Sequence, residues 1–320
     1  MKQVAAPVLL LLLAPLEACL AAQPVPQDES LAWLVKMSVA AQQLNYTGTF
    51  IYQQGGRNET SRIAHLVEAG REYEKIESLD GLPRETIRSN DQVTCYYPES
   101  KTVRVEKRPA RSFPAVFPEQ LSGIAEYYEV KKEGMDRVAG FACQVTVLKP
   151  KDSLRYSHSF CAEVKTGLPL RAQTVNERGD VVERFAFTQL SLGGNIGKDK
   201  VRPRFSLKDP GWRLDQSPPH ETLATDTGWE VKDSPAGFRK IMEAKRMIQG
   251  KAAAHIVYSD GLAAVSVFVE PAQTSGRSEA HSGAINIYTR PYQEHTVTIL
   301  GEAPASTVRK MGDSVTYRGK

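Results

Sequence analysis

With 320 residues, of which 41 % are hydrophobic and 24 % are charged, the chain has the composition of a globular protein and is long enough for two domains. Its formal net charge of +4 at pH 7 is small for its length. A charge this close to neutrality argues against a nucleic-acid-binding protein.

The first residues have the pattern of a secretory signal peptide. Lys2 supplies a positive charge, residues 8–13 are continuously apolar, and small residues lead to a cleavage site after Ala21 or Ala22. We therefore expect residues 1–22 to be removed and the protein to be exported, since no later segment is long and apolar enough for a membrane helix. The sequence Leu16-Glu-Ala-Cys19 also resembles a lipobox, so acylation of Cys19 is the alternative to ordinary cleavage.

One amphipathic helix is expected directly after the signal peptide. Apolar side chains recur at helical spacing from Trp33 to Leu44, and Asp28 or Ser30 can cap the helix. Asn45 ends the helical pattern. The strand that follows, residues 46–52, places three aromatic side chains on one face: Tyr46, Phe50 and Tyr52.

From residue 53 to about residue 192, short strands alternate with turn sequences, which indicates an antiparallel meander. The meander is interrupted at residues 108–126, where Phe113 and Phe117 lie between prolines and Pro118 can start a short helix. We predict an α+β fold, in which a large curved antiparallel sheet (residues 23–195) is covered by helices. A polar linker rich in Pro and Gly follows at residues 196–214.

Residues 215–320 are predicted to form a smaller α+β domain. Ser234-Pro235 is expected to cap a helix that continues to Gly250, and residues 253–258 and 262–270 read as a hairpin around Ser259-Asp-Gly261. Residues 271–282 are expected to be a mobile loop. A second hairpin (284–290 and 295–300), a helix at 305–311 and a strand at 315–318 complete the domain.

Three cysteines remain after the signal peptide, and an exported protein can oxidise two of them. A hairpin centred on Asp152 would place Cys143 directly opposite Cys161 and allow a disulfide. A register shifted by one residue would put them on opposite faces and leave two buried thiols. No Cys or His pair has the spacing of a metal site, so no metal and no other cofactor is expected.

The sequence contains no recognisable catalytic motif. Its six histidines are scattered, and the run Ser157-His158-Ser159 does not form a dyad, because adjacent side chains of a strand point to opposite faces. We therefore do not expect an enzyme, although a hydrolase with an unfamiliar site is an alternative.

A curved sheet backed by helices can enclose an apolar hollow for a lipid. The candidate lining residues are Trp33, Phe50, Tyr52, Phe185 and Phe187, with Phe113 and Phe117 as a lid; ordinary core packing is the alternative for most of them. Basic residues just before the lid are candidates for contacts with a lipid head group or an acidic partner: Arg104, Lys107, Arg108 and Arg111.

Several segments of the two predicted domains, taken together, form a pattern typical of one protein family. In the first domain they are Trp33-Leu-Val-Lys-Met37, Leu44-Asn-Tyr-Thr-Gly-Thr-Phe50, Asp136-Arg-Val-Ala-Gly140, Leu154-Arg-Tyr156, Thr166-Gly-Leu-Pro-Leu170 and residues 185–190. In the second domain they are residues 258–270 and 301–308. With these segments the chain resembles the RseB/MucB family of periplasmic sigma-E regulators. The resemblance covers nearly the whole mature chain in the right order, and its specificity comes from this co-occurrence.

The resemblance implies a first domain similar to the lipoprotein carriers LolA and LolB, and a periplasmic location. It also implies that the protein binds the periplasmic part of a membrane-anchored anti-sigma factor, shields it from the site-1 protease, and is released by lipopolysaccharide or another amphiphile. A lipid or lipoprotein carrier is the alternative function, and a homo-oligomer is left open. The resemblance further implies that the small domain supplies much of the anti-sigma contact. We therefore predict that residues of one hairpin make this contact: Tyr258, Asp260, Leu262 and Val267.

Overall fold

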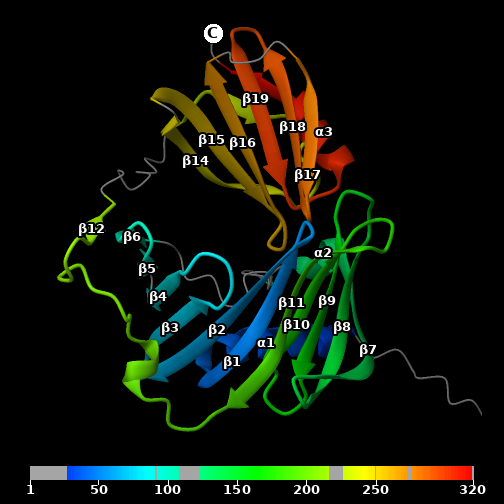
Figure 1. Ribbon diagram of the computed structural model, residues 1–320. Coiled ribbons are helices and arrows are strands. Elements are labelled where there is room, and N and C mark those ends of the chain that lie inside the picture. The colour runs from blue at the N-terminus through cyan, green and yellow to red at the C-terminus, as the bar shows by residue number, and fades with distance from the viewer. Residues whose placement is uncertain are drawn as a thin grey trace, which may run out of the picture.

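The computed structural model describes residues 27–90, 92–107, 121, 123–215, 226–248, 250–271 and 276–318. Within them the chain forms two β-sheet domains, and a long connection runs along one side of the first (Figure 1). The predicted large antiparallel sheet with a smaller second domain is confirmed. Several predicted features lie outside the described residues: the signal peptide, Cys19, Arg108, Arg111, Phe113, Phe117 and the side chain of Lys107.

The described residues of the first domain form one sheet, two α-helices and a short 3₁₀ helix. The helices are α1 (Gln27–Gln43), α2 (Ile124–Tyr127) and the 3₁₀ helix η1 (Lys198–Val201). The strands are β1 (Tyr46–Gln54), β2 (Arg57–Glu68), β3 (Arg71–Ser78), β4 (Glu85–Ser89), β5 (Gln92–Tyr97), β6 (Thr102–Lys107), β7 (Tyr128–Val138), β8 (Phe141–Pro150), β9 (Ser157–Glu163), β10 (Pro169–Val175), β11 (Val181–Leu192) and β12 (Arg213–Leu214).

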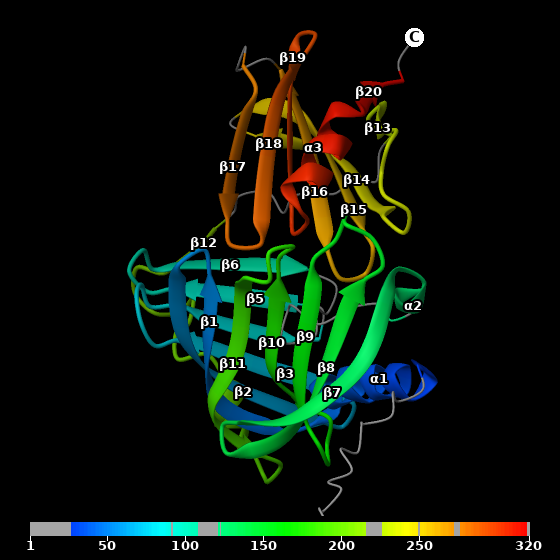
Figure 2. The same ribbon diagram turned by 90° about the vertical axis from the view of Figure 1, so that its right-hand side faces the viewer.

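The 12 strands lie in the order β12-β6-β5-β4-β3-β2-β1-β11-β10-β9-β8-β7. Neighbours are antiparallel apart from β12, a two-residue strand that pairs with β6 in parallel. The sheet is strongly curved, so that its two halves face each other like the walls of a half-barrel (Figure 2). Strands β1 and β11, which are distant in sequence, pair in the middle of the sheet and join the two halves.

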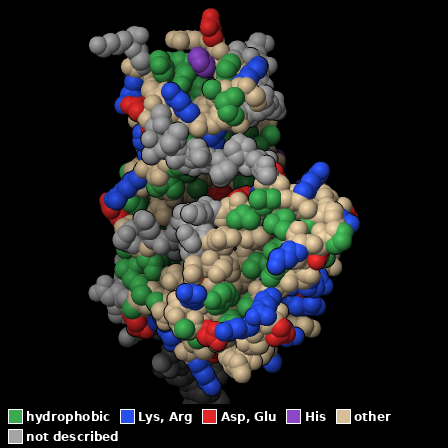
Figure 3. All heavy atoms as spheres, turned by 90° about the vertical axis from the view of Figure 1, so that its left-hand side faces the viewer, with side chains coloured by type: hydrophobic (Ala, Val, Ile, Leu, Met, Phe, Trp, Pro, Cys, Tyr) green, Lys and Arg blue, Asp and Glu red, His purple; other side chains and the backbone are tan. Residues whose placement is uncertain are grey.

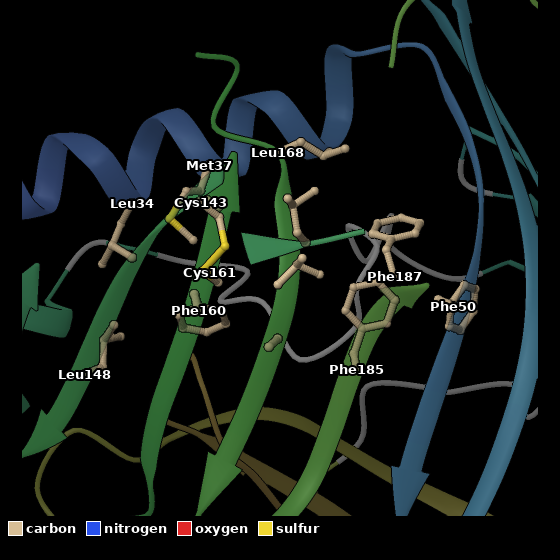
Figure 4. Packing of buried hydrophobic residues seen from close by; sticks show 14 of the residues in the cluster. Leu34, Met37, Phe50, Cys143, Leu148, Phe160, Cys161, Leu168, Phe185 and Phe187 are labelled. Carbon is tan, nitrogen blue, oxygen red and sulfur yellow. A yellow bond between two sulfur atoms is a disulfide. The ribbon is translucent and has the colours of Figure 1, made fainter. Parts of the chain in front are cut away.

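Helix α1 follows the predicted apolar pattern and lies across the strands (Figure 4). Leu34, Met37 and Ala40 are at most 5 % exposed, whereas Val35 and Val39 on the other side are exposed. After the helix, the Asn45 side-chain oxygen accepts a hydrogen bond from the Val67 amide at 2.7 Å. This bond ties the end of the helix to β2, and it explains why the chain turns into β1 at this point.

Cys143 and Cys161 form a disulfide with a Cα–Cα distance of 5.3 Å. The pairing of β8 with β9 differs from the hairpin centred on Asp152, because Cys143 lies opposite Glu163 and Cys161 lies opposite Val145. The two cysteines are therefore diagonal neighbours. A register that differs by two residues keeps both side chains on one face of the hairpin, which leaves the bond possible.

The connection after β11 covers part of the opposite side of the first sheet. Ile196 and Val201 pack against Ala64 and Leu66 of β2, which makes a small second hydrophobic cluster. Figure 3 shows this side of the molecule, where basic and acidic side chains are interspersed over the first domain. The segment predicted as a linker is thus packed on the first domain along much of its length.

One ion-pair network fastens this connection to the sheet. Glu85 is 1 % exposed; its carboxylate lies 3.0 Å from Lys75 Nζ and 2.6 Å from Arg204 Nε. Burial alone would raise the pKa of Glu85, but hydrogen bonds from Arg204 and Lys75 hold it below its usual value.

In the second domain, the part of the chain that the structure describes forms a six-stranded sheet, a two-stranded sheet and one helix. Its elements are β13 (Trp229–Val231), β14 (Arg239–Ile248), β15 (Lys251–Ser259), β16 (Ala264–Pro271), β17 (Ser278–Ser282), β18 (Ile285–Tyr292), β19 (His295–Gly301), α3 (Ala305–Asp313) and β20 (Val315–Tyr317). The larger sheet has the order β14-β15-β16-β19-β18-β17, and β13 pairs with β20. Met311 and Val308 of α3 are fully buried against this sheet.

The prediction of a helix from Ser234 to Gly250 is wrong. Residues 235–238 form a turn in which the Phe238 amide donates to the Pro235 carbonyl, and β14 follows, paired with β15 along its length. The register shifts between Lys240 and Met242, and this irregularity gives the apolar residues a spacing like that of a helix. The predicted loop at 271–282 is also wrong in part, because it contains strand β17.

Candidate functional site

The face of the first sheet that carries Tyr46, Phe50 and Tyr52 is called the aromatic face below. On the neighbouring strand β11, Phe187 lies opposite Phe50 and Phe185 lies opposite Tyr52. The ring centroids of Phe185 are 5.1 Å from those of Phe50 and Phe187, and these three side chains are 1–6 % exposed (Figure 4). The phenylalanines predicted to line a hollow are therefore in mutual contact as a packed cluster.

The other two predicted lining residues have different surroundings. Trp33 is partly buried between α1 and β7, where Lys36 Nζ and Lys132 Nζ lie 4.9 and 5.5 Å from its ring centroid. Three strands separate β7 from β11 in the sheet order, so Trp33 belongs to a different part of the domain from the phenylalanine cluster. Tyr52 donates a hydrogen bond to Glu183, and burial together with that carboxylate raises the pKa of Tyr52.

A row of polar side chains crosses the aromatic face from β1 to β4. The register places Tyr46 opposite His65, His65 opposite Glu74, and Glu74 opposite Arg88. Tyr46 and His65 are fully buried, Glu74 is 2 % exposed, and the Tyr46 ring stacks on the His65 ring with centroids 4.9 Å apart. The sequence spacing does not reveal this row, because each member comes from a different strand.

The hydrogen bonds of the row are incomplete among the described residues. His65 Nδ1 donates to the Leu44 carbonyl at 2.7 Å, and His65 Nε2 lies 3.1 Å from Glu72 Oε1. Glu74 Oε2 and the Tyr46 hydroxyl have no hydrogen-bond partner there. Burial raises the pKa of Tyr46, and the charges of Glu74 and Glu72 raise it further.

A buried ion pair joins the two domains. Arg155 Nε lies 2.8 Å from Asp260 Oδ2, and both side chains are 0 % exposed. The Tyr128 hydroxyl donates to the same carboxylate oxygen at 3.1 Å. The Arg155 guanidinium also donates to the Ala236 carbonyl and lies 5.2 Å from the centre of the Phe238 ring. Arg155 therefore contacts two separate segments of the second domain.

Further contacts complete this interdomain junction. Asn286 Nδ2 donates to the Tyr156 hydroxyl at 2.7 Å, and Thr307 Oγ1 donates to the Leu154 carbonyl at 3.0 Å. Gly237 has a φ of +88°, and a Cβ there would lie 2.5 Å from the Tyr127 ring, so only glycine fits. Beneath the junction, burial lowers the pKa of His158 to about 4 despite the nearby charge of Asp260.

Of the four residues predicted to contact an anti-sigma factor, two are buried in the second domain and two lie at the interdomain junction. Tyr258 and Val267 belong to the core of the second domain, at 7 % and 0 % exposure. Asp260 is the buried partner of Arg155, and Leu262 packs against the core of the first domain. In this arrangement of the domains, these side chains hold the hairpin and the junction together.

Among the predicted head-group residues, the structure describes the side chain of Arg104 alone. Arg104 is paired with Asp215, with Nε and Nη2 at 3.0 and 2.8 Å from one carboxylate oxygen. Elsewhere, a cavity of about 370 Å³ is lined by Arg137, Arg171 and Arg184, on the side of β11 opposite the phenylalanine cluster. Asp136 already pairs with Arg171 at 2.8 Å, so this cavity is partly neutralised.

Comparison with known proteins gives a consistent result over both domains. Residues 29–205 match the MucB/RseB N-terminal domain, and residues 224–316 match the MucB/RseB C-terminal domain. The chain belongs to the MucB/RseB family. It is 30 % identical over 319 residues to the sigma factor AlgU regulatory protein MucB of Pseudomonas aeruginosa, covering 96 % of each chain. It is 26 % identical to the sigma-E factor regulatory protein RseB of Salmonella typhimurium, covering 90 % of each.

Solved structures of the family have the same fold. A crystal structure of MucB in complex with MucA(peri) aligns with a TM-score of 0.75 at 25 % identity, covering 91 % of this chain and all of that one. The Pseudomonas aeruginosa MucA/MucB complex aligns with a TM-score of 0.76 at 26 % identity, again over 91 % of this chain. The resemblance predicted from sequence motifs is thus confirmed over both domains. Among the described residues, we find no helix with the length and apolar character needed to span a bilayer.

Proposed function

We propose that this chain is a periplasmic negative regulator of a sigma-E envelope stress response. In this proposal it binds the periplasmic part of a membrane-anchored anti-sigma factor and shields that segment from the site-1 protease. The observation that carries the proposal is the match of both domains to MucB, which has been solved in complex with the periplasmic part of MucA. The role is one of binding, without catalysis, and the first 22 residues act as the export signal.

Binding to the anti-sigma segment separates this function from its alternative, a lipid or lipoprotein carrier. A carrier can use the same helix-covered sheet, but it has no need of the second domain or of its buried attachment through Arg155 and Asp260. The regulator is expected to capture the anti-sigma segment in a pull-down, and a carrier is expected to release lipoproteins from membranes instead.

The lipid that releases such a regulator is proposed to bind next to Phe113 and Phe117, which lie outside the described residues. The phenylalanine cluster on β1 and β11 is closed in the described structure, so an acyl chain must displace side chains or use space beside the cluster. Arg104 is proposed as a head-group contact together with Lys107, Arg108 and Arg111. A phosphate bound by Arg104 would take the place of Asp215.

Replacing both lid residues, as Phe113→Asp together with Phe117→Asp, should abolish amphiphile binding, because two carboxylates oppose the entry of an acyl chain. Fluorescence titration with lipopolysaccharide measures this loss, and circular dichroism checks that the fold is intact. The matched control is Leu79→Asp with Leu82→Asp, two apolar residues that are 42 % and 72 % exposed in a turn. Unchanged lipid binding in the lid variant would reject the lid.

The anti-sigma contact is proposed to involve the hairpin of β15 and β16. Tyr258 and Val267 are buried, and Asp260 and Leu262 face the first domain. A direct contact with Asp260 or Leu262 therefore requires the interdomain junction to open. In the closed arrangement these residues act by fixing the shape of the surface that the anti-sigma factor meets.

A further inference from the structure

Three side chains on the aromatic face have possible metal-ligand atoms close together: His65 and Glu74 of the polar row, and Glu72 beside them on β3. One ligand atom each from His65, Glu72 and Glu74 lies within 4.8 Å of the other two. They come from adjacent strands: His65 from β2, and Glu72 and Glu74 from the same face of β3. The register of one strand pair therefore fixes all three positions, and the backbone beneath them is held by the ladder of hydrogen bonds.

The orientation of His65 leaves one ring nitrogen for a ligand. A carbonyl oxygen only accepts hydrogen bonds, so the 2.7 Å contact with Leu44 places a proton on Nδ1. Nε2 then points at Glu72, at 3.1 Å from Oε1. A backbone carbonyl that orients the far nitrogen of the ring is the usual support of a metal-bound histidine.

Two buried polar atoms at this place have no partner among the described residues. Glu74 is 2 % exposed; Arg88 lies 3.9 Å from its Oε1, but Oε2 accepts no hydrogen bond. The hydroxyl of Tyr46 is also without a partner, at 0 % exposure, and the Tyr46 ring stacks on the ring of His65. A buried oxygen that is left unsatisfied is costly, typically about 1–3 kcal/mol. A bound cation would satisfy the buried Glu74 carboxylate oxygen.

We propose that His65, Glu72 and Glu74 bind a divalent transition-metal ion, with Zn²⁺ as the best fit to these ligands. Zn²⁺ takes imidazole nitrogen and carboxylate oxygen in tetrahedral sites, whereas Mg²⁺ and Ca²⁺ select sites made of oxygen alone. Tetrahedral donors at zinc lie about 3.4 Å apart, so the ligands must close slightly around the ion. The Glu72 side chain is 20 % exposed, which gives it room to move and gives the ion a route from solvent.

The site would hold β2 and β3 together on the face that also bears the phenylalanine cluster. It is independent of the anti-sigma proposal, since it involves neither the second domain nor the lid. Without the metal, a proton on His65 Nε2 can pair with Glu72 instead, but that arrangement gives no partner to Glu74 Oε2 or to the Tyr46 hydroxyl.

Calorimetric titration of the purified protein with ZnCl₂, after EDTA treatment and removal of the chelator, tests the site. One ion is expected to bind per chain, with a dissociation constant of about 1 μM or tighter. His65→Gln and Glu74→Gln should each weaken binding by at least about 100-fold, because each removes a ligand. His255→Gln is the matched control: His255 is also buried, at 6 % exposure, but lies in the second domain, and its loss should leave the affinity unchanged.

Circular dichroism shows whether each variant is folded. Glu74→Gln keeps the size of the side chain, so its zinc affinity still tests the site if His65→Gln does not fold. Absence of zinc binding to the unaltered protein at about 100 μM would overturn the proposal. Binding within about threefold of normal in Glu74→Gln would also overturn it, because the ion would then be bound elsewhere.

Discussion

Arg155→Met should lower the free energy of unfolding by about 3–5 kcal/mol. The substitution removes a cation whose partner, Asp260, is 0 % exposed and would remain as a buried, uncompensated carboxylate. The hydrogen bond that Arg155 donates to Ala236 and its contact with the Phe238 ring are lost at the same time. Because these contacts link the domains, the unfolding transitions of the two domains should also separate.

Urea unfolding, followed by tryptophan fluorescence and circular dichroism, measures this effect. Arg178→Met is the matched control, since Arg178 pairs with Asp180 in an exposed turn at 78 % exposure and should change stability by less than about 1 kcal/mol. Adding Asp260→Leu to Arg155→Met should recover part of the loss, because no lone charge then remains buried. A loss below about 1 kcal/mol in the single variant would contradict the assignment of Arg155 as the central link between the domains.

Phe185→Ala should lower the free energy of unfolding by about 3–5 kcal/mol. The Phe185 ring is 1 % exposed and lies between Phe50 and Phe187, so its removal leaves a cavity that neighbouring strands cannot fill without distortion. Val181→Ala on the same strand is the control; Val181 is 50 % exposed, and its truncation should cost less than about 0.5 kcal/mol.

The same measurement distinguishes a closed core from an open lipid hollow. A ring that lines an open hollow has few contacts on one side, so its loss would cost much less than the loss of a packed ring. A decrease of under about 1 kcal/mol for Phe185→Ala, with the fold retained, would show that the cluster on β1 and β11 is open in solution.

Local patterns in the sequence are sufficient to predict many of the helices, strands and turns of the fold. Leu34, Met37 and Ala40 recur at helical spacing and form the buried stripe of α1, and Ser259-Asp-Gly261 marks the turn between β15 and β16. The pattern failed at β14, where an irregular register near Ile241 gives a strand the apolar spacing of a helix. Pairing with β15, which no local pattern records, decides the structure of that segment.

The candidate sites depend on contacts between distant residues, and this limited what the sequence could predict. The phenylalanines of β1 and β11 were recognised as apolar, but their mutual contact follows from the pairing of strands more than 130 positions apart, such as Tyr52 with Phe185. The family resemblance points to Asp260, but its burial against Arg155 requires two domains to meet. The row from Tyr46 to Arg88 likewise needs the register of four strands.

The central claim, that this chain is a regulator of the MucB/RseB type, is tested most directly by titrating the purified protein with the periplasmic segment of the anti-sigma factor from the same organism. We predict a specific complex at micromolar concentration or below, in which the segment resists cleavage by the site-1 protease. No binding at micromolar concentration, together with lipoprotein release activity, would contradict the account and identify a carrier instead.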